Sequence, residues 1–312
     1  MKRERRYLLE RVANLYFKED MKQEIIAKKL GISRPNISRL LNEAKKKGIV
    51  EIKINYESSD DNYKRELAES VEKKFDLHEA ILVQNLPTEE ETKNSVSDIA
   101  SSFFDDRVTR NSIVGVTAGT TLEMMAKKIR EKKKDVSIVT LIGSVNYQHT
   151  TFLSHEIARL ISSNIDGKSF LLTVPALLSS KEMVQNFISQ PGIEDTLNLF
   201  KKIKWGFLGV GAINPEHPFL HMFEKSDLEK IKSEAVGNIG TIFYNSKGEI
   251  VCKDITEKTF GIKTDQLMSI PYRVGIASGK KKIKAISGAV KSRLLNILII
   301  DIESAKNLLN QK

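Results

Sequence analysis

Seven short apolar runs in the later part of the sequence constrain the fold more than any other feature. They lack the strict polar–apolar alternation of strands with one face in water, so both faces should be buried. Amphipathic, helix-like stretches separate the runs. The runs span 80–83, 113–116, 136–142, 170–174, 207–210, 274–277 and 297–300. This repetition predicts an α/β domain in which helices cover an open, mostly parallel sheet with right-handed crossovers.

A segment near the start of the chain has the pattern of a helix-turn-helix. Residues 23–41 have the sequence QEIIAKKLGISRPNISRLL. Ala27 is small where two helices must come close, Gly31 allows a sharp turn with positive φ, and Pro35 is tolerated in a first helical turn. Ser33 can cap the second helix. An ordinary helical hairpin would not need all of these residues together, so we predict a second helix that can lie in a DNA major groove.

Polar side chains on and beside that second helix are the expected DNA contacts. Arginine pairs well with guanine and asparagine with adenine, whereas serine suits phosphates or base edges. The residues assigned to DNA are Gln23, Ser33, Arg34, Pro35, Asn36, Ser38, Arg39 and Asn42. Lys28, Lys29 and Lys45–Lys47 are interpreted as phosphate contacts, which add affinity without sequence choice.

The charge of the chain is concentrated in this region. The net charge is +10, and residues 1–57, with 15 Lys and Arg against 8 Asp and Glu, carry +7 of it. Such asymmetry indicates a basic part that meets a polyanion and a nearly neutral remainder, although a merely solubilising surface has the same composition. An alternating stretch at 49–54 predicts a short strand, and the polar stretch at 55–62 predicts a boundary. We therefore expect a DNA-binding domain at 1–57, called the head, and a second domain at 58–312, called the body.

Cysteine usage and hydropathy narrow the class of protein further. Cys252 is the single cysteine, which excludes a disulfide framework and a cysteine-based zinc site and suits a reducing cytosol. No apolar run approaches the roughly 18 residues that would cross a bilayer, and the basic start lacks the apolar segment of a signal peptide. We expect a soluble, cytoplasmic protein without a membrane partner.

A turn in the body has the composition of an anion site. Residues 117–121, Thr-Ala-Gly-Thr-Thr, join a predicted strand at 112–116 to a predicted helix at 122–130. Glycine and hydroxyls at such a turn place free N–H and Oγ donors around an anion. The pattern alone fits a plainer interpretation as well, in which Gly119 makes the turn and Thr120 or Thr121 caps the helix. Because G-x-G-x-x-G is absent, NAD is not expected, and no cofactor is predicted.

Six further motifs follow the helix-turn-helix in order. They are KGIVEI at 47–52, VGVTAGTTL at 114–122, FLGVGA at 207–212, GNIG at 237–240, ASGKKK at 277–282 and NILIID at 296–301. With segment 30–41, they resemble the SorC/DeoR-type family of bacterial sugar-binding transcriptional regulators over essentially the whole chain. The resemblance implies a Rossmann-like effector domain related to sugar-phosphate isomerases, assembly into dimers or tetramers, and a phosphorylated sugar as effector.

Effector-binding residues are expected at the carboxyl ends of the strands, where open α/β sheets bind ligands. The residues assigned to the effector are Gly119, Thr120, Thr121, Gly143, Ser144, Pro175, Asn238 and Lys282. By resemblance, Lys282 matches a family lysine that could neutralise the phosphate; from the sequence alone it is equally well a solvated lysine. Pro175 has the simpler alternative of ending a strand.

Two positions depart from the family pattern, and a third bears on the chemistry of the effector. Relatives commonly have Asp at the position of Asn238 and Gly at that of Ser278, so the effector is expected to differ from that of relatives with Asp. Ile142 stands where a lysine would be needed for a Schiff base with an aldehyde sugar. A noncovalent effector is therefore expected.

Weaker patterns carry structural predictions. His217 and His221 have a spacing that can bind a metal on a helix, but Pro215 and Pro218 predict a loop there and no metal site. Residues 245–248 predict a hairpin turn. Trp205 is expected in the core.

The sequence thus predicts a non-enzymatic regulator of a carbohydrate-utilisation operon. The head would bind a two-fold operator in double-stranded DNA, and a phosphorylated sugar would shift the population of subunit arrangements. One alternative is a sugar-phosphate isomerase or deaminase with an appended head, although no catalytic residues are predicted: Asp166 and Asp301 are isolated, and Asp301 fits better as a strand-end cap. The other is a nonspecific nucleoid protein.

Overall fold

The computed structural model describes residues 3–50, 59–132, 135–145, 153–214 and 217–311. The chain divides into two compact units, residues 1–59 and 60–312, and each is described by itself. The domain boundary predicted after residue 57 lies outside the described residues. Of the strand predicted at 49–54, Ile49 and Val50 form no strand, and the remainder also lies outside the described residues.

The head unit contains the predicted helix-turn-helix. Its helices are α1 (Arg3–Phe17), α2 (Gln23–Leu30) and α3 (Arg34–Lys46). Gly31 follows α2 at φ +66°, and its N–H donates to the carbonyl of Ala27, as the turn requires. Ser33 occupies the cap position of α3, but its hydroxyl makes no capping hydrogen bond, so that part of the prediction is wrong.

The head has a core of its own. Leu9 and Val12 of α1 pack with Ile26 of α2, and with Ile37 and Leu40 of α3, and all five side chains are buried. The apolar positions of α3 recur every three to four residues, which places one stripe of the helix in this core and leaves the other face to solvent.

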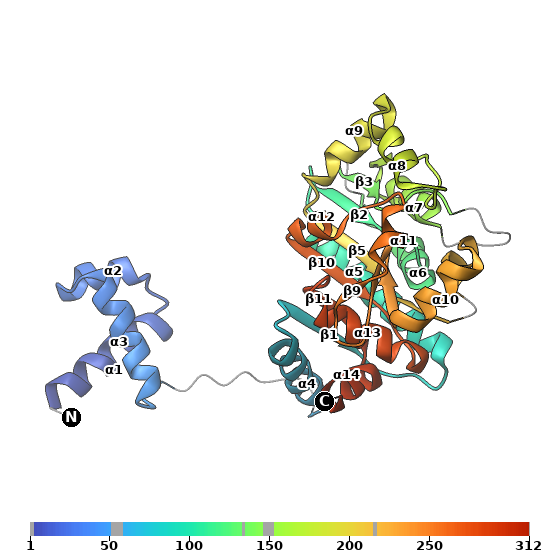
Figure 1. Cartoon of the computed structure of the whole chain (residues 1–312). Coiled ribbons are helices and arrows are strands. Elements are labelled where there is room, and N and C mark those ends of the chain that lie inside the picture. Colours follow the sequence, from blue (N-terminus) through green and yellow to red (C-terminus); the bar gives the residue numbers. More distant parts are fainter. Residues whose placement is uncertain (1–2, 51–58, 133–134, 146–152, 215–216, 312) are drawn as a thin grey trace. The chain divides into compact units, whose positions relative to one another are not determined.

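The body is built on one seven-stranded sheet, and every strand pair in it is parallel (Figure 1). The strand order is β1-β11-β10-β5-β2-β3-β4. The strands are β1 (Glu79–Val83), β2 (Ile113–Val116), β3 (Ser137–Thr140), β4 (Lys168–Phe170), β5 (Trp205–Gly209), β10 (Tyr272–Ile276) and β11 (Ile297–Asp301). All seven predicted runs contribute a strand, and the predicted fold class is confirmed. The run at 170–174 is shifted, because only Phe170 of it belongs to β4.

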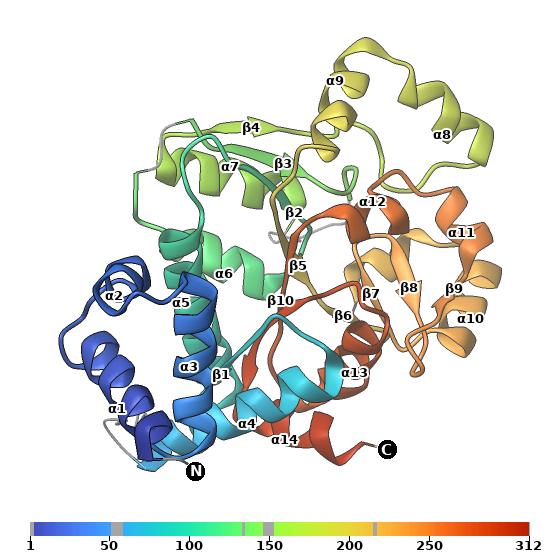
Figure 2. The same ribbon diagram turned by 90° about the vertical axis from the view of Figure 1, so that its left-hand side faces the viewer.

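Helices cover both faces of this sheet (Figure 2). One core joins Leu298 and Ile300 of β11 to α4 (Ser59–Phe75), α13 (Ile283–Lys291) and α14 (Ile302–Asn310). The other joins Ile297 and Ile299 to α5 (Glu89–Arg107), α6 (Thr120–Lys128) and α7 (Ser154–Ile165). Successive residues of β11 thus enter opposite cores, as the period of a strand dictates.

A second, antiparallel sheet extends from the carboxyl end of β5. Its strands, in the order β6-β7-β8-β9, are β6 (Gly211–Ala212), β7 (Gly237–Ile239), β8 (Ile242–Tyr244) and β9 (Ile250–Val251). The predicted hairpin at 245–248 joins β8 and β9. The remaining elements are α8 (Lys181–Ile188), α9 (Pro191–Phe200), η1 (Pro218–Met222), α10 (Lys225–Glu234), α11 (Lys253–Glu257), α12 (Thr264–Ser269) and η2 (Lys280–Lys282).

Two further structural predictions concern the core and the end of β11. Trp205 is 5% exposed, so its assignment to the core is confirmed. Asp301 caps α14 by accepting a hydrogen bond from the backbone N–H of Ser304.

In the part of the chain that the structure describes, no helix is both long and apolar enough to span a bilayer.

The segment after β3 makes a close backbone contact that generates a stability prediction. A Cβ at Gly143 would lie 2.4 Å from the carbonyl oxygen of Val174. We expect Gly143→Ala to lower the free energy of unfolding by about 1–3 kcal/mol, because backbone atoms would have to move. Urea denaturation followed by Trp205 fluorescence measures this. Gly192→Ala is the control, because no atom lies within 4 Å of its added Cβ; equal losses in both variants would contradict the packing argument.

Candidate functional site

A cavity of about 340 Å³ lies at the carboxyl edge of the parallel sheet. Its wall is formed by the turn after β2, the segments after β3 and β5, the residue before α7, the residues at η1, the middle of β7, the end of β10 and the residue that precedes α13. Its size falls in the range of small-molecule sites, and its position is the one that open α/β sheets use for ligands.

The turn after β2 places the start of α6 at this cavity. Gly119 occupies the position before α6 at φ +152°, and no side chain caps the helix. The interpretation in which a threonine merely caps α6 is therefore not what the structure shows. The hydroxyl of Thr117 accepts a hydrogen bond from the N–H of Gly209, which fixes the turn against β5. The first N–H groups of α6 have no partner within the helix, and together with Thr120 and Thr121 they suit an anion.

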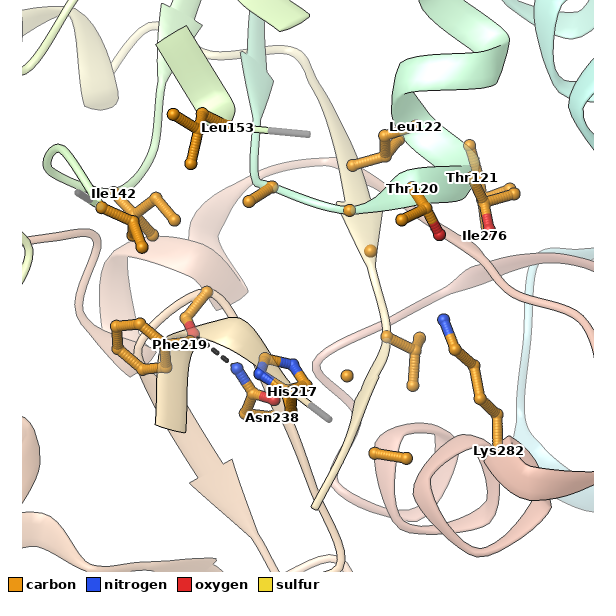
Figure 3. A pocket seen from close by; sticks show the side chains of 18 of the residues that line it. Thr120, Thr121, Leu122, Ile142, Leu153, His217, Phe219, Asn238, Ile276 and Lys282 are labelled. Atoms are coloured by element: carbon orange, nitrogen blue, oxygen red, sulfur yellow. Dashed lines mark hydrogen bonds between the residues drawn. The ribbon is translucent and has the colours of Figure 1, made fainter. Parts of the chain in front are cut away.

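Lys282 reaches the same part of the cavity from η2. Figure 3 shows its side chain extending toward Thr120 and Thr121. Burial, together with the charge of Lys93, lowers the pKa of Lys282 to about 8. The neighbouring Lys280, Lys281 and Lys284 are exposed, so Lys282 differs from the rest of its lysine run. Among the described residues, no carboxylate lies within ion-pair distance of its ammonium group.

Asn238 and His217 form an uncharged polar part of the cavity. Asn238 is 5% exposed, and its Nδ2 donates to the carbonyl of Gly240. Burial, and secondarily the charge of Lys282, lowers the pKa of His217 to about 4, so its ring is neutral near pH 7. Within the described chain, Asn238 Oδ1 and His217 Nδ1 are buried without a hydrogen-bond partner. The oxygen accepts hydrogen bonds and the ring nitrogen can donate or accept one, so both indicate a place for polar groups of a ligand.

Gly211 allows these two side chains to lie where they do. It pairs with Asn238 across β6 and β7. A Cβ at Gly211 would lie 2.2 Å from Asn238 Oδ1 and 2.4 Å from His217 Nε2. Neither Gly211 nor His217 is among the residues that the sequence assigns to the site. The two glycines after an apolar run in 207–212 were the signal for the first, whereas nothing in the sequence distinguished the second.

Three of the residues assigned to the effector are not brought to the cavity wall. Gly143 donates its N–H to the carbonyl of Phe260, and Ser144 pairs with Val174 and Ala176. Pro175 is exposed beside that bridge. The wall contains Ile142 instead. A residue's place just after a strand in the sequence therefore does not determine whether it faces the cavity. Gly119, Thr120, Thr121, Asn238 and Lys282 do line the cavity.

The polar face of the head is open to solvent. Of the residues assigned to DNA, Ser33, Arg34, Pro35, Asn36, Arg39 and Asn42 are exposed, and Gln23 and Ser38 are partly exposed. Arg34 forms an ion pair with Glu24 at 3.4 Å. Both groups are well solvated, so breaking the pair costs little. The guanidinium of Arg34 is therefore available to a nucleic acid.

An ion cluster at the other end of α3 fixes α1 against it. Glu43 accepts hydrogen bonds from Arg5 of α1 and from Lys47. Those two hydrogen bonds lower the pKa of Glu43 to about 2, which keeps the carboxylate charged at neutral pH. This cluster joins α1 to α3, and the small core joins all three helices.

The loop predicted around the histidine pair is in part a 3₁₀ helix. His217 precedes η1 and His221 lies within it. No group of three or more potential metal-ligating side chains occurs among the described residues.

Comparison with known proteins places this architecture in a class. Residues 61–310 match the family described as "Putative sugar-binding domain". The chain is 28% identical to the deoxyribonucleoside regulator of Bacillus subtilis over 316 aligned positions, which cover 99% of each chain. It is 29% identical to the sorbitol operon regulator of Klebsiella pneumoniae, covering 97% of each.

Solved structures agree in fold. The crystal structure of the full-length sorbitol operon regulator SorC from Klebsiella pneumoniae matches with a TM-score of 0.75 and 25% identity, covering 97% of this chain and 99% of that one. A transcriptional regulator from Streptococcus pneumoniae matches with a TM-score of 0.76 and 22% identity over 80% of this chain and 97% of that one. An α/β domain with a cavity at its parallel strand ends, joined to a helix-turn-helix head, defines a class of ligand-sensing regulators. The chain belongs to the sugar-binding domain family and, within it, to the SorC/DeoR-type transcriptional regulators.

The environment of Lys282 generates a pH prediction. The pKa of Lys282 lies near 8 in the unliganded protein, so its ammonium group, which attracts anions, is lost as the pH rises above this value. We expect the affinity for inorganic phosphate, measured by calorimetry, to be higher at pH 7 than at pH 9.5. Lys282→Gln should weaken binding at pH 7 about tenfold or more and flatten the pH dependence.

The exposed Lys281 provides the control for this prediction. Lys281→Gln removes the same charge from the adjacent residue and should retain the wild-type pH dependence. A Lys282→Gln variant that binds phosphate as the wild type does would remove this lysine from the anion site.

Proposed function

We propose that this protein regulates transcription of a carbohydrate-utilisation operon and that a phosphorylated sugar controls its binding to operator DNA. The observation that carries the proposal is the convergence of Lys282, two threonines and the start of α6 in one cavity. This arrangement supplies a cation, hydroxyls and free N–H groups to a phosphate. The regulator names of the relatives support the DNA-binding part. We place this activity in the cytoplasm, where such DNA lies.

In this proposal the exposed face of α3 contacts bases. Arg34, Asn36, Ser38, Arg39 and Asn42 supply base contacts, while Gln23, Ser33 and Pro35 fix the start of the helix on the duplex. One short helix discriminates weakly, so we propose that a homodimer or homotetramer presents paired heads to a two-fold operator. Each good base contact contributes about 1–3 kcal/mol of discrimination.

The effector is proposed to bind with its phosphate at Gly119, Thr120, Thr121 and Lys282 and its hydroxyls at Asn238. Gly143, Ser144 and Pro175 then contribute indirectly, because their backbone pairing supports the wall that carries Ile142. Preferential binding to one subunit arrangement would change head spacing by a population shift. A coupling free energy of about 1–3 kcal/mol would change operator affinity about 5–150-fold.

Binding rather than catalysis is supported by the side chains of the cavity. Among its described lining residues there is no Asp or Glu, and His217 has a pKa too low for efficient proton transfer at neutral pH. Asp301 is occupied as a cap, and Asp166 pairs with Lys132. The enzyme alternative predicts turnover of aldose or amino-sugar phosphates by the purified protein, and a rate near the typical ten per second would establish it.

The DNA part of the proposal is tested on α3. We expect Asn36→Ala and Arg39→Ala each to weaken binding to an operator, selected from a random duplex library with the wild-type protein, by about 5–150-fold. Both side chains are exposed, so the thermal stability and the affinity for phosphorylated sugars should not change. Gel-shift titrations measure the DNA affinity. Loss of sugar binding as well would indicate unfolding, and equal displacement by any competitor duplex would favour the nucleoid alternative.

The effector part is tested at the start of α6. A thermal-shift screen of phosphorylated sugars should find a ligand that stabilises the protein by about 2.7 kcal/mol at 100 times its Kd. Thr120→Ala combined with Thr121→Ala should abolish the effect of that ligand on operator binding. The paired serine substitutions keep both hydroxyls and should retain the effect. An unchanged response in the alanine variant would exclude this turn from the site.

A further inference from the structure

The part of the head that carries the assigned DNA contacts has few carboxylates. Residues 21–50 contain eight Lys and Arg but only two acidic residues, Glu24 and Glu43. Glu43 is held by Arg5 and Lys47 at the far end of α3. Glu24 is the other carboxylate, and its side chain is 68% exposed. An exposed carboxylate next to DNA repels the phosphates and weakens binding to any sequence. Its presence at this surface therefore needs an explanation.

Glu24 contacts one of the residues assigned to DNA. It lies in the first turn of α2, and its Oε1 lies 3.4 Å from Nη1 of Arg34, the first residue of α3. In the described head, no other ion pair or hydrogen bond involves the guanidinium of Arg34, so its Nε and Nη2 can still donate. A guanidinium is planar and carries five N–H groups. It can therefore keep a carboxylate on one edge and bind O6 and N7 of guanine with another.

This ion pair is suited to a function in the DNA complex rather than in the free protein. In the free protein it contributes little to stability, because water surrounds both side chains. A duplex that covers the start of α3 displaces part of this water, and the attraction between carboxylate and guanidinium then increases. The carboxylate also restricts the rotamers of Arg34, whose long side chain otherwise loses conformational entropy when it binds a base.

We propose that Glu24 is a positioning residue that holds Arg34 in the orientation that recognises guanine, and that its charge lowers the affinity for nonspecific DNA. The inference rests on the proposed function, in which α3 contacts bases, and it adds a residue of α2 that acts through Arg34. Two effects of opposite sign follow. Without the carboxylate, the head repels every duplex less, but it distinguishes guanine less well from the other bases.

A purely structural role of Glu24 leads to a different expectation. Helix α2 has no side-chain cap, so an acidic residue in its first turn stabilises it through the partial positive charge of the helix N-terminus. Removing that charge would destabilise the head slightly and weaken binding to all sequences alike. Base selectivity therefore separates the two roles, whereas stability does not.

Base selectivity is measured with the full-length protein and the operator selected from the random library. Gel-shift titrations of all single base-pair variants of this operator, with the wild type and with Arg34→Ala, identify the G·C pair that Arg34 recognises. At this pair we expect Glu24→Gln to reduce the discrimination against other bases about 3- to 10-fold, because the guanidinium loses its charged partner. Binding to an unrelated duplex at low salt should become about twofold tighter.

Two controls separate the contact from the charge. Glu19→Gln removes another exposed carboxylate of the head, one that forms no ion pair with any described residue, and it should leave base selectivity unchanged. When Arg34→Ala is already present, Glu24→Gln should reduce selectivity no further, because the two side chains act as one unit. Selectivity is a ratio of two affinities, so a partly unfolded fraction of a variant cancels from it.

The possible results all decide the inference. Unchanged selectivity in Glu24→Gln, or the same loss in the presence of Arg34→Ala as in the wild type, would overturn it while leaving the DNA-binding proposal in place. It would also be wrong if Arg34→Ala relaxed the preference at no G·C pair. If the wild type selected no operator at all, the proposed function would fail, and this inference with it.

Discussion

The parallel direction of the strand pairing determines where the other functional features of the body lie. Because β2, β5 and β10 run the same way, their carboxyl ends meet at one edge, and the helices that follow β2 and β10, namely α6 and η2, begin there. A helix that begins at such an edge presents unpaired N–H groups to it. The site therefore favours an anion through its backbone, before any side chain is considered. Lys282 adds the full charge of its ammonium group at the same edge of the sheet.

Close backbone contacts shape the cavity on both sides of β5. A Cβ at Gly209 would lie 2.5 Å from the carbonyl oxygen of Ala118, so the turn after β2 can rest on β5 only because Gly209 lacks one. Two residues later, Gly211 leaves room for Asn238 and His217. Both glycines belong to one short segment, 207–212. This segment thus positions Thr120 and Thr121 through the turn, and Asn238 and His217 through the small sheet.

The large elements were predictable because their signals are physical and local. A strand that is buried on both faces, such as β11, requires a continuous apolar run. The buried face of α3 requires apolar residues every three to four positions. Both patterns can be recognised in the sequence. The small sheet did not appear beyond its hairpin, because β6 and β7 contain only two and three residues. Gly143 was assigned to the effector from its place after a strand, but its tight approach to Val174 depends on a segment that is distant in sequence. His217 enters the site through the same kind of tertiary contact.

The body also offers a contiguous series of elements from the cavity to its first helix. Lys282 immediately precedes α13, and α13 packs against α14 in the core that contains Ile286 and Leu308. The ammonium of Lys74 in α4 donates to the carbonyls of Leu308, Leu309 and Gln311 at the end of α14. Coupling through packing requires such contiguity, and it requires that the series have two arrangements of different ligand affinity. In the proposed function, a phosphate bound at Lys282 would change the charge at one end of this series, while α4, at the other end, begins at Ser59. The regulatory proposal therefore needs no contact between effector and DNA; it needs only that α13, α14 and α4 move as packed bodies when the subunits change arrangement.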